Sequence, residues 1–370
     1  MIKKIFTFFI LSTVIFLTGC WETRILDEIA LVQIVAFDLD EGEGVYEQTV
    51  GFPSYFEAGE EGQLENVTLS SRGRSPKETR NELTRDWQRP LRYGQLRILA
   101  FSQHLAEGEG ISAFVESFYR DPRVGNQIHL SIMEGEAKKA IDTDHTGARE
   151  RVGMYFANLI EENENAENIP RSNLHSFLFD FHSDGKDAYL PFLKTVEDRI
   201  IVNGLALFDG EKKVAHLGPD ESFIFKMILE GSHSGNHTFE VKRDGVDVTL
   251  HLDNIHSRVR YEEVKRNPHP HYVVQLDVKG DVDDFIGEVN LENDQHLKAV
   301  EDSIANQIED TGERLINYFV DLNIDPLGFG EQYRSRTRDW DPKEWKETKY
   351  PLLTAEVKVD VNILQFGATD

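Results

Sequence analysis

The residue with the most readily assigned chemistry is Cys20, the single cysteine among 370 residues. A cysteine thiolate is the best nucleophile among ordinary side chains, so it can take up a lipid group. Gly19, directly before it, has no side chain to obstruct a peptidase. With no second cysteine in the sequence, neither an intramolecular disulfide nor a site of several cysteine ligands for a metal can form. Cys20 is therefore predicted to carry a covalent modification.

The segment before Cys20 has the pattern of a secretory signal peptide. Lys3 and Lys4 form a short positive head, thirteen uncharged residues follow over 5–17, and the chain turns polar at Glu22. Thirteen residues at about 1.5 Å each span only roughly 20 Å, which is short of the ~30 Å hydrocarbon core of a bilayer. A permanent membrane helix is the weaker interpretation.

The end of this segment, Leu17-Thr18-Gly19-Cys20, resembles the lipobox of bacterial lipoproteins. The resemblance implies that a diacylglyceryl group is attached to the sulfur and that the chain is cut before Cys20, so that residues 1–19 are a lipoprotein signal peptide. Two acyl chains at ~0.8 kcal/mol per buried CH₂ hold a protein at a membrane, whereas one chain binds only marginally. The alternative is an ordinary secreted protein whose cysteine lies near the cleavage site by chance.

A second candidate group lies near the C-terminus. Arg334, Arg336 and Arg338 stand in an otherwise acidic chain, close to Trp340 and Trp345. Arginine and tryptophan are enriched in binding hot spots, so this loop is predicted to contact a partner subunit. The alternative is that both tryptophan rings pack on the core and the arginines balance local acids.

No pattern in the sequence supports catalysis. The metalloprotease pattern H-E-x-x-H, the nucleophile elbow G-x-S-x-G and the phosphate loop G-x-x-x-x-G-K-[ST] are all absent. The thirteen histidines include His233 and His237, but their turn-like surroundings favour surface histidines over zinc ligands. Gly328-Phe329-Gly330 predicts a loop where the backbone passes closely rather than a nucleotide site. We therefore expect a protein that is not an enzyme, with no cofactor and no metal.

The net charge of −26 also limits the partners. Nucleic acid is a poor partner for so acidic a surface. An anionic membrane surface repels it too, so a lipid anchor rather than charge attraction must hold the protein there. Such acidity also suits a saline or alkaline habitat, where charge keeps proteins soluble.

Periodicity predicts a first α/β domain over residues 20–141. Two apolar runs, 29–37 and 45–52, flank an Asp/Gly-rich turn and predict a hairpin. Ser75-Pro76-Lys77-Glu78 predicts a helix start with a serine cap. Helices alternate with strands through the rest of this region, as in mixed α/β domains.

Two further domains are predicted. Residues 142–231 form a middle α/β domain, and the linker-like segment 231–235 marks its end. In the C-terminal domain, residues 232–370, four strands form a meander, a long helix covers 290–323, and a last strand covers 353–364. The predicted fold class is α+β, with three domains and a C-terminal antiparallel sheet plus one long helix.

Several segments together resemble one family, the Ger(x)C lipoproteins, which are the C subunits of spore germinant receptors. The residues that carry the resemblance occur in order along nearly the whole chain. They are Gly19-Cys20-Trp21-Glu22, Phe37-Asp38-Leu39-Asp40, Tyr93 and Gln95 to Phe101, Gly110-Ile111, Arg120-Asp121-Pro122, Val202 to Phe208, and Asp325-Pro326-Leu327-Gly328-Phe329-Gly330 with Trp340 and Trp345. One departure is Tyr93-Gly94-Gln95-Leu96, where the family usually has a Gly-His pair.

The resemblance implies a lipoprotein on the outer, extracytoplasmic face of the spore inner membrane, built of three α/β domains. It implies partners as well: an integral-membrane A subunit and a B subunit similar to amino-acid permeases. The expected function is that of a lipid-anchored, non-enzymatic C subunit whose protein–protein contacts are needed to trigger germination. The alternative is a substrate-binding lipoprotein that delivers a nutrient to a membrane transporter. Direct germinant binding stays open.

Overall fold

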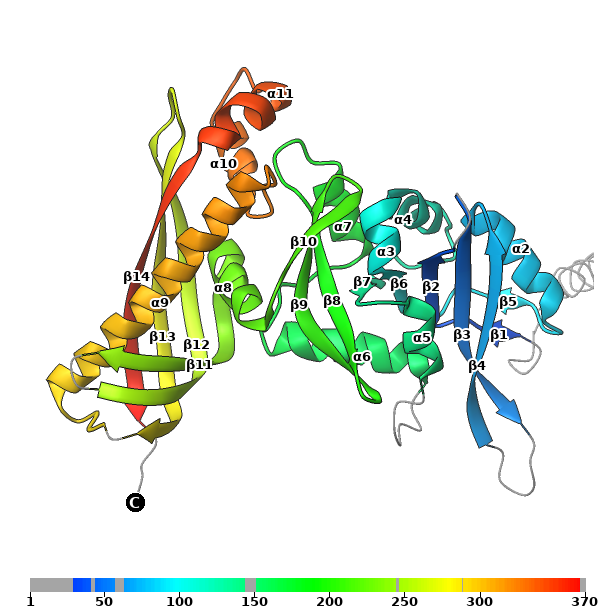
Figure 1. Cartoon of the computed structure of the whole chain (residues 1–370), viewed down its shortest axis with the longest axis horizontal. Coiled ribbons are helices and arrows are strands. Elements are labelled where there is room, and N and C mark those ends of the chain that lie inside the picture. The colour runs from blue at the N-terminus through cyan, green and yellow to red at the C-terminus, as the bar shows by residue number, and fades with distance from the viewer. Residues whose placement is uncertain are drawn as a thin grey trace, which may run out of the picture.

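The computed structural model describes most of the chain after the predicted signal segment, and its elements follow one another along an elongated body (Figure 1). Residues 1–19 and Cys20 lie outside the described residues. Within the part of the chain that is described, every helix is too short or too polar to traverse a bilayer. The described ranges are 29–40, 44–56, 63–143, 151–243, 246–287 and 289–366.

Eight strands share one large mixed sheet. From one edge to the other they are β10 (Lys212–Leu217), β9 (Arg199–Asp209), β8 (Tyr189–Val196), β7 (His129–Met133), β6 (Ile98–Ser102), β2 (Ile34–Leu39), β3 (Tyr46–Phe56) and β4 (Gln63–Gly73). The central strands β8, β7, β6 and β2 run parallel, and the strands outside them pair antiparallel. The predicted hairpin is confirmed, because β2 and β3 pair with Ile34 opposite Gly51.

Helices cover both faces of this sheet because its central strands are apolar on both sides. Val35 and Phe37 of β2 point into one core, while Ile34 and Ala36 point into the other. On the first face lie α3 (Gln103–Gly108), α4 (Ser112–Tyr119) and α7 (Leu174–Phe181), and on the second face lie α5 (Ala137–Asp142) and α6 (Val152–Asn165).

The predicted helix start at Ser75 is confirmed in α2 (Pro76–Asp86). The Ser75 hydroxyl accepts the N–H of Glu78 over 3.2 Å, and the Glu78 carboxylate accepts the N–H of Arg74 over 2.8 Å. Beside the large sheet, β1 (Ala30–Leu31) and β5 (Leu91–Arg92) form a short parallel pair.

The predicted boundary near residue 141 falls between strands of the same sheet. Ile132 of β7 pairs with Phe192 of β8, so segments on both sides of that boundary are hydrogen-bonded to each other. The division of the chain into three domains stays a prediction.

Four strands and one long helix make up the C-terminal part, and the predicted mixed fold class is confirmed. The elements are β11 (Ser232–Arg243), β12 (Val246–Lys265), β13 (His271–Gly287), α9 (Asp294–Asp321) and β14 (Thr354–Phe366). The sheet differs from the expectation in one respect, because β14 runs parallel to β13. The reason is the connection: α9, about 42 Å long at 1.5 Å per residue, carries the chain back to the end where β13 began.

Two local predictions in this region were wrong. The segment 231–235 is not a linker, because Gly231 ends α8 (Pro219–Glu230) with φ of 80° and Ser232 already pairs with Ser257 in the sheet. Ser232 is fully buried, and its hydroxyl donates to the carbonyl of Ile255 over 2.9 Å. Two of the four strands predicted for the meander are one continuous strand, β12, whose pairing with β13 shifts register near its middle, between Asp253 and His256.

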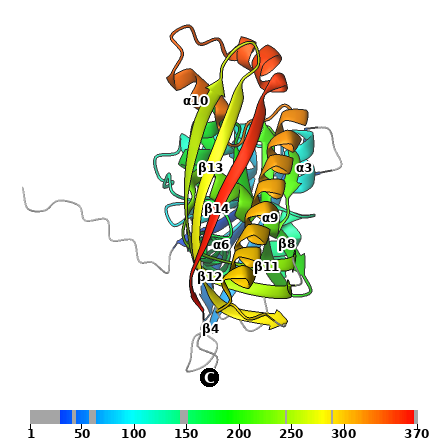
Figure 2. The same cartoon turned by 90° about the vertical axis from the view of Figure 1, so that its left-hand side faces the viewer.

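The long helix α9 lies along β14, the edge strand of this sheet (Figure 2). Three of its glutamates accept backbone N–H groups that β14 would otherwise leave unpaired at the open edge. Glu313 binds Val357 over 3.1 Å, Glu309 binds Val359 over 2.8 Å, and Glu301 binds Ile363 over 3.0 Å. This helix therefore closes the edge with polar contacts as well as apolar ones.

One apolar core continues from the large sheet into the C-terminal part. Tyr189, Leu205 and Leu207 of β8 and β9 belong to the same cluster as α8, α9 and the four-stranded sheet. The rings of Phe225 on α8 and Phe319 on α9 meet edge to face with centroids 5.9 Å apart. The middle and C-terminal segments are therefore packed against each other.

Candidate functional site at the junction of the middle and C-terminal segments

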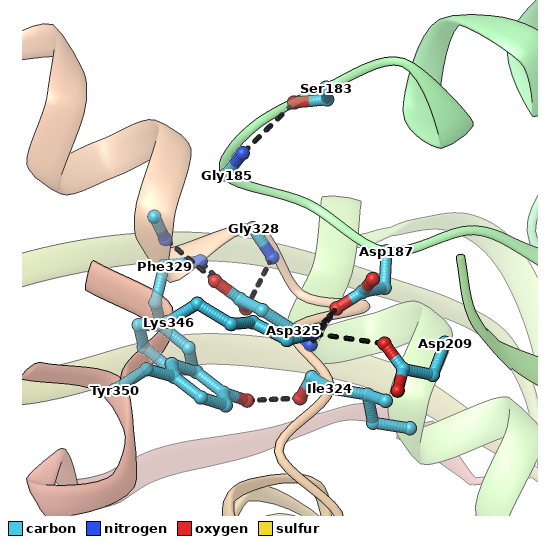
Figure 3. Close-up of polar contacts among 11 residues, drawn as sticks. Ser183, Gly185, Asp187, Asp209, Ile324, Asp325, Gly328, Phe329, Lys346 and Tyr350 are labelled. Carbon is cyan, nitrogen blue, oxygen red and sulfur yellow. Dashed lines mark hydrogen bonds and ion pairs between the residues drawn. The ribbon is translucent and has the colours of Figure 1, made fainter. Parts of the chain in front are cut away.

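The junction is organised around Asp325, which follows α9 and is buried. Its carboxylate accepts three successive backbone N–H groups, from Gly328 and Phe329 at 2.9 Å and from Gly330 at 2.7 Å (Figure 3). These groups open α10 (Phe329–Ser335), so Asp325 satisfies N–H groups that the helix itself cannot pair. Gly328 has a φ of 76°, a left-handed conformation that glycine adopts without strain.

Asp325 is also joined to the middle segment through Asp187. The N–H of Asp325 donates to the Asp187 carboxylate over 2.7 Å, and the N–H of Asp187 donates to the Asp325 carbonyl over 3.0 Å. The backbone of the loop before β8 and the backbone after α9 are thereby held together by two hydrogen bonds.

Lys346 adds a cation to this pair of acids. Its ammonium lies 3.3 Å from the Asp187 carboxylate and 3.2 Å from that of Asp209, at the end of β9 (Figure 3). Lys346 belongs to a π-helical turn, Trp345–Lys349, which follows α11 (Pro342–Glu344) and precedes a 3-10 turn, Tyr350–Leu352. The Tyr350 hydroxyl in that last turn donates to the Ile324 carbonyl.

Two glycines allow the backbones to meet at this point. The N–H of Glu331 donates to the Gly185 carbonyl over 3.1 Å. A Cβ on Gly330 would lie only 2.7 Å from the Gly185 Cα, the Gly185 carbonyl oxygen and the Trp345 Nε1. The predicted close passage of the backbone at Gly328-Phe329-Gly330 is confirmed, although the segment opens a helix rather than forming only a loop.

Burial sets the electrostatics of the junction. Desolvation raises the pKa of Asp325 to about 7, against hydrogen bonds from Gly330 and Phe329 that favour the ionised form. Burial also raises the pKa of Asp187, while Lys346 opposes that shift. Both oxygens of Asp325 are already occupied by backbone donors and are closed off from solvent. The arrangement suits the holding of two segments in one position, not proton transfer to a substrate.

The predicted contact residues Trp340 and Trp345 lie beside this junction. Trp345 is only 2% exposed and packs against Tyr333 and Tyr350, with ring centroids 5.0 and 5.8 Å away. Trp340 is partly buried, and its ring centroid is 6.0 Å from that of Trp345. Both rings therefore pack on the core, as the alternative interpretation expects, and Trp345 is not accessible to a partner.

The three predicted arginines lie in different environments. Arg334 pairs with Glu331 on the same helix at 2.7 Å, and Arg336 lies 3.8 Å from Glu263 of β12. Arg338 is exposed, and within the described ranges it makes no ion pair. The arginines remain proposed contact residues, with Arg334 nearest to the junction.

Sequence reasoning missed the roles of Asp187 and Asp325. Asp325 had a usable signal, because it precedes Pro326 and the Gly-Phe-Gly segment at the end of a helix, where a side-chain acceptor for α10 is needed. Asp187 had none, because its partner lies 138 residues away. Among the described residues, no group of three or more His, Cys, Asp or Glu side chains is placed to hold a metal ion.

Comparison with known proteins covers both halves of the chain. Residues 22–195 match the family model described as the spore germination protein N-terminal domain, and residues 203–367 match "Spore germination B3/GerAC like, C-terminal". The spore germination protein GerQC of Bacillus cereus is 30% identical over 368 residues, covering 100% of both chains.

A second relative is more distant, and a solved structure shows the fold. The spore germination protein KC of Bacillus subtilis (strain 168) is 20% identical over 400 residues, covering 99% of this chain and 96% of the relative. The crystal structure of the GerBC protein superimposes with a TM-score of 0.55 at 14% identity, over 89% of this chain and 96% of that chain.

Proposed function

Because this chain belongs to the GerAC-like family of spore germination proteins, the C subunits of germinant receptors, we propose that it acts as a lipid-anchored, non-enzymatic receptor subunit. In this role it lies on the outer face of the spore inner membrane and contributes protein–protein contacts that are needed to trigger germination. Its partners are integral-membrane subunits of the same receptor.

The observation that carries the contact role is the junction around Asp187 and Asp325. A substrate-binding lipoprotein usually closes two lobes around its ligand, which requires a hinge that opens. Here the middle and C-terminal segments share one apolar core, and the Gly185 and Gly330 backbones touch. Two segments fixed to each other in this way favour a rigid surface for partner subunits over a cleft that opens and closes around a nutrient.

The proposed membrane anchor is argued from Cys20 and from the net charge of the protein. The mature chain, without Lys3 and Lys4, has a net charge of −28, so an anionic membrane surface repels it. A diacylglyceryl group on Cys20 supplies the attachment that the acidic body lacks. Replacement of Cys20 by alanine should move the protein from the membrane fraction of spores to the soluble fraction and weaken the germination response. Full membrane retention of this variant would contradict the anchor.

Calorimetry separates the receptor-subunit proposal from the nutrient-binding alternative. The chain from Glu22 onward, purified in soluble form, is titrated with amino acids and sugars that germinate the spores. We expect no heat of binding from the subunit alone. Micromolar binding of one of these nutrients would favour the substrate-binding lipoprotein instead.

A further inference from the structure

A groove with a volume of about 740 Å³ lies where three parts of the chain meet. It is lined by Tyr119 and Arg120 at the C-terminal end of α4, by Leu178 and Phe179 of α7, and by Glu331 and Arg334 of α10. The predicted N-terminal, middle and C-terminal domains each supply one wall. A site built from all three parts exists only when the junction around Asp325 is closed.

Two aromatic side chains in the lining of the groove are exposed to solvent. Phe179 is 69% exposed and Tyr119 is 43% exposed, although Phe177 and Leu178 on the same helix as Phe179 are buried in the core. Packing of the core accounts for the apolar residues on the inner side of α7, but it does not account for Phe179. Aromatic rings that remain exposed around a depression are typical anchor points for a partner protein.

The lining of the groove also offers hydrogen-bond donors from Arg120 and Arg334. Arg120 pairs with Glu116 and Arg334 pairs with Glu331, each along its own helix and at the surface, where such pairs contribute little. Arg120 uses Nη2, and Arg334 uses Nε and Nη2. Within the described residues the other guanidinium N–H groups make no hydrogen bond, so each arginine can still bind a carboxylate.

Two of the three acids that line the groove are paired with its arginines, Glu116 with Arg120 and Glu331 with Arg334. Both carboxylate oxygens of Glu331 are engaged, one by Arg334 and the other by the Ser183 hydroxyl at 2.7 Å. Asp184 also lines the groove and disfavours an occupant that is anionic throughout. The charges fit an apolar segment that carries a carboxylate at one side, facing the two guanidiniums.

The exposure of Phe179 and Tyr119 favours a protein over a small molecule as the occupant. Small-molecule sites bury 70–90% of the ligand surface. A ligand lying on Phe179, which itself leaves most of its ring to solvent, would stay largely exposed. A segment of another protein is followed by the rest of that protein, which can cover both the aromatic rings and the two arginines.

We propose that this groove is the docking site for a segment of a partner receptor subunit, an inference that rests on the proposed function. The segment inserts an aromatic or branched aliphatic side chain between Tyr119 and Phe179 and places an Asp or Glu side chain against Arg120 and Arg334. Its apolar contact supplies the affinity, and the ion pairs fix its orientation.

Site-specific photo-crosslinking in the full, membrane-anchored chain tests the proposal. Benzoylphenylalanine replaces Phe179 in one variant and Ile286 in a control, because Ile286 is 75% exposed on β13 and lies outside the groove. We expect the probe at 179 to crosslink a segment of an integral-membrane protein that contains an apolar residue next to Asp or Glu. Crosslinks from 286 to that same segment, with none from 179, would overturn the proposal.

Charge reversal tests the recognition chemistry. Arg120→Glu combined with Arg334→Glu should lower the amount of co-purified partner about tenfold or more, with unchanged thermal unfolding. Arg85→Glu, at an exposed arginine of α2 that pairs with Glu82 along its own helix and lies outside the groove, should leave the amount unchanged. Changing the crosslinked acid of the partner to lysine should restore capture by the charge-reversed protein. If the charge-reversed protein captures as much partner as the wild type does, the proposed docking site is wrong.

The outcomes separate the groove from the function on which it rests. If the unaltered chain captures no membrane protein, the proposed function fails. If it captures one and both arginine reversals leave that capture intact, only the groove is wrong. A free nutrient that binds the isolated chain and contacts the probe at position 179 would show that the groove holds a small molecule. That result would overturn the proposal as well.

Discussion

Asp187 and Asp325 are paired by two hydrogen bonds in opposite directions, from the N–H of Asp325 to the Asp187 carboxylate and from the N–H of Asp187 to the Asp325 carbonyl. The pair joins positions 138 residues apart and makes the middle and C-terminal segments one body. The groove between α4, α7 and α10 depends on that closure, because Glu331 and Arg334 lie on α10, the helix whose first N–H groups Asp325 accepts.

Removal of the Asp325 carboxylate should destabilise the protein. Asp325→Ala leaves the N–H groups of Gly328, Phe329 and Gly330 without their buried acceptor, and an unsatisfied buried donor costs about 1–3 kcal/mol. We expect a loss of about 3 kcal/mol or more in the free energy of unfolding, measured with urea and tryptophan fluorescence. Asp339→Ala, at an exposed site, is the matched control and should change stability by less than about 0.5 kcal/mol.

The same carboxyl group predicts a pH dependence with a definite sign. The folded pKa of about 7 lies above the ordinary value of 3.8, so the native state binds this proton more tightly than the unfolded state. The stability that Asp325 contributes is therefore full below about pH 4 and is lost as the pH rises to about 7. Asp187 and Asp180 have raised pKa values too and act in the same direction.

Comparison with Asp325→Asn isolates the contribution of Asp325. The difference in unfolding free energy, wild type minus Asn variant, should fall between about pH 4 and about pH 8 by up to about 4 kcal/mol. Asp187, Lys346 and Tyr350 are present in both proteins, so the difference reports mainly on Asp325. A difference that rises with pH would show that the pKa of Asp325 is lowered by folding.

The contact between Gly185 and Gly330 predicts a size limit. A methyl group at position 330 meets the Gly185 backbone and the Trp345 ring at 2.7 Å, and backbone cannot move aside as a flexible side chain can. Gly330→Ala should destabilise the protein by about 1–3 kcal/mol, the usual cost of overpacking, and should lower partner capture. Gly125→Ala, where a Cβ meets nothing within 4 Å, is the control in thermal unfolding. Equal melting temperatures for both variants would contradict the close contact.

The glutamates of α9 predict protection of a sheet edge. Replacing Glu301, Glu309 and Glu313 by alanine uncovers the N–H groups of Val357, Val359 and Ile363 on β14. An uncovered edge strand pairs with other chains, so the variant should lose a few kcal/mol of stability, about 1 for each hydrogen bond, and should aggregate more readily. Light scattering during heating measures the aggregation.

Two control variants test whether these bonds are the cause. The triple glutamine variant keeps a carbonyl acceptor at each position and should aggregate little, and Asp310→Ala, on the exposed side of α9, should behave as wild type. Equal aggregation of the alanine and glutamine variants would show that hydrogen bonding to β14 is not the protective feature.

Local patterns in the sequence were sufficient for much of the fold. The serine cap at Ser75 and the buried stripe of α9 follow from spacing alone, because capping and amphipathic packing act within a few residues. The direction of β14 depends instead on how far α9 carries the chain. Composition alone could not reveal the role of Ser232. Its Gly/Ser-rich segment has the composition of a linker, but in the fold its hydroxyl donates to a buried carbonyl of β12.

The candidate site was predictable only in part. The loop with Arg334 was found through its charge, but its tryptophans serve the core and the second arginine of the groove, Arg120, comes from α4. The pairing of Asp187 with Asp325 depends on contacts between distant segments, for which a single sequence offers no local signal.

Capture of partners by the full, tagged chain from detergent-solubilised spore membranes tests the proposed function most directly. We predict that integral-membrane receptor subunits co-purify with it and that Cys20→Ala lowers their yield in the membrane fraction. Recovery of the chain alone from membranes that contain those subunits, together with micromolar nutrient binding by the soluble part, would contradict a role in protein–protein contacts.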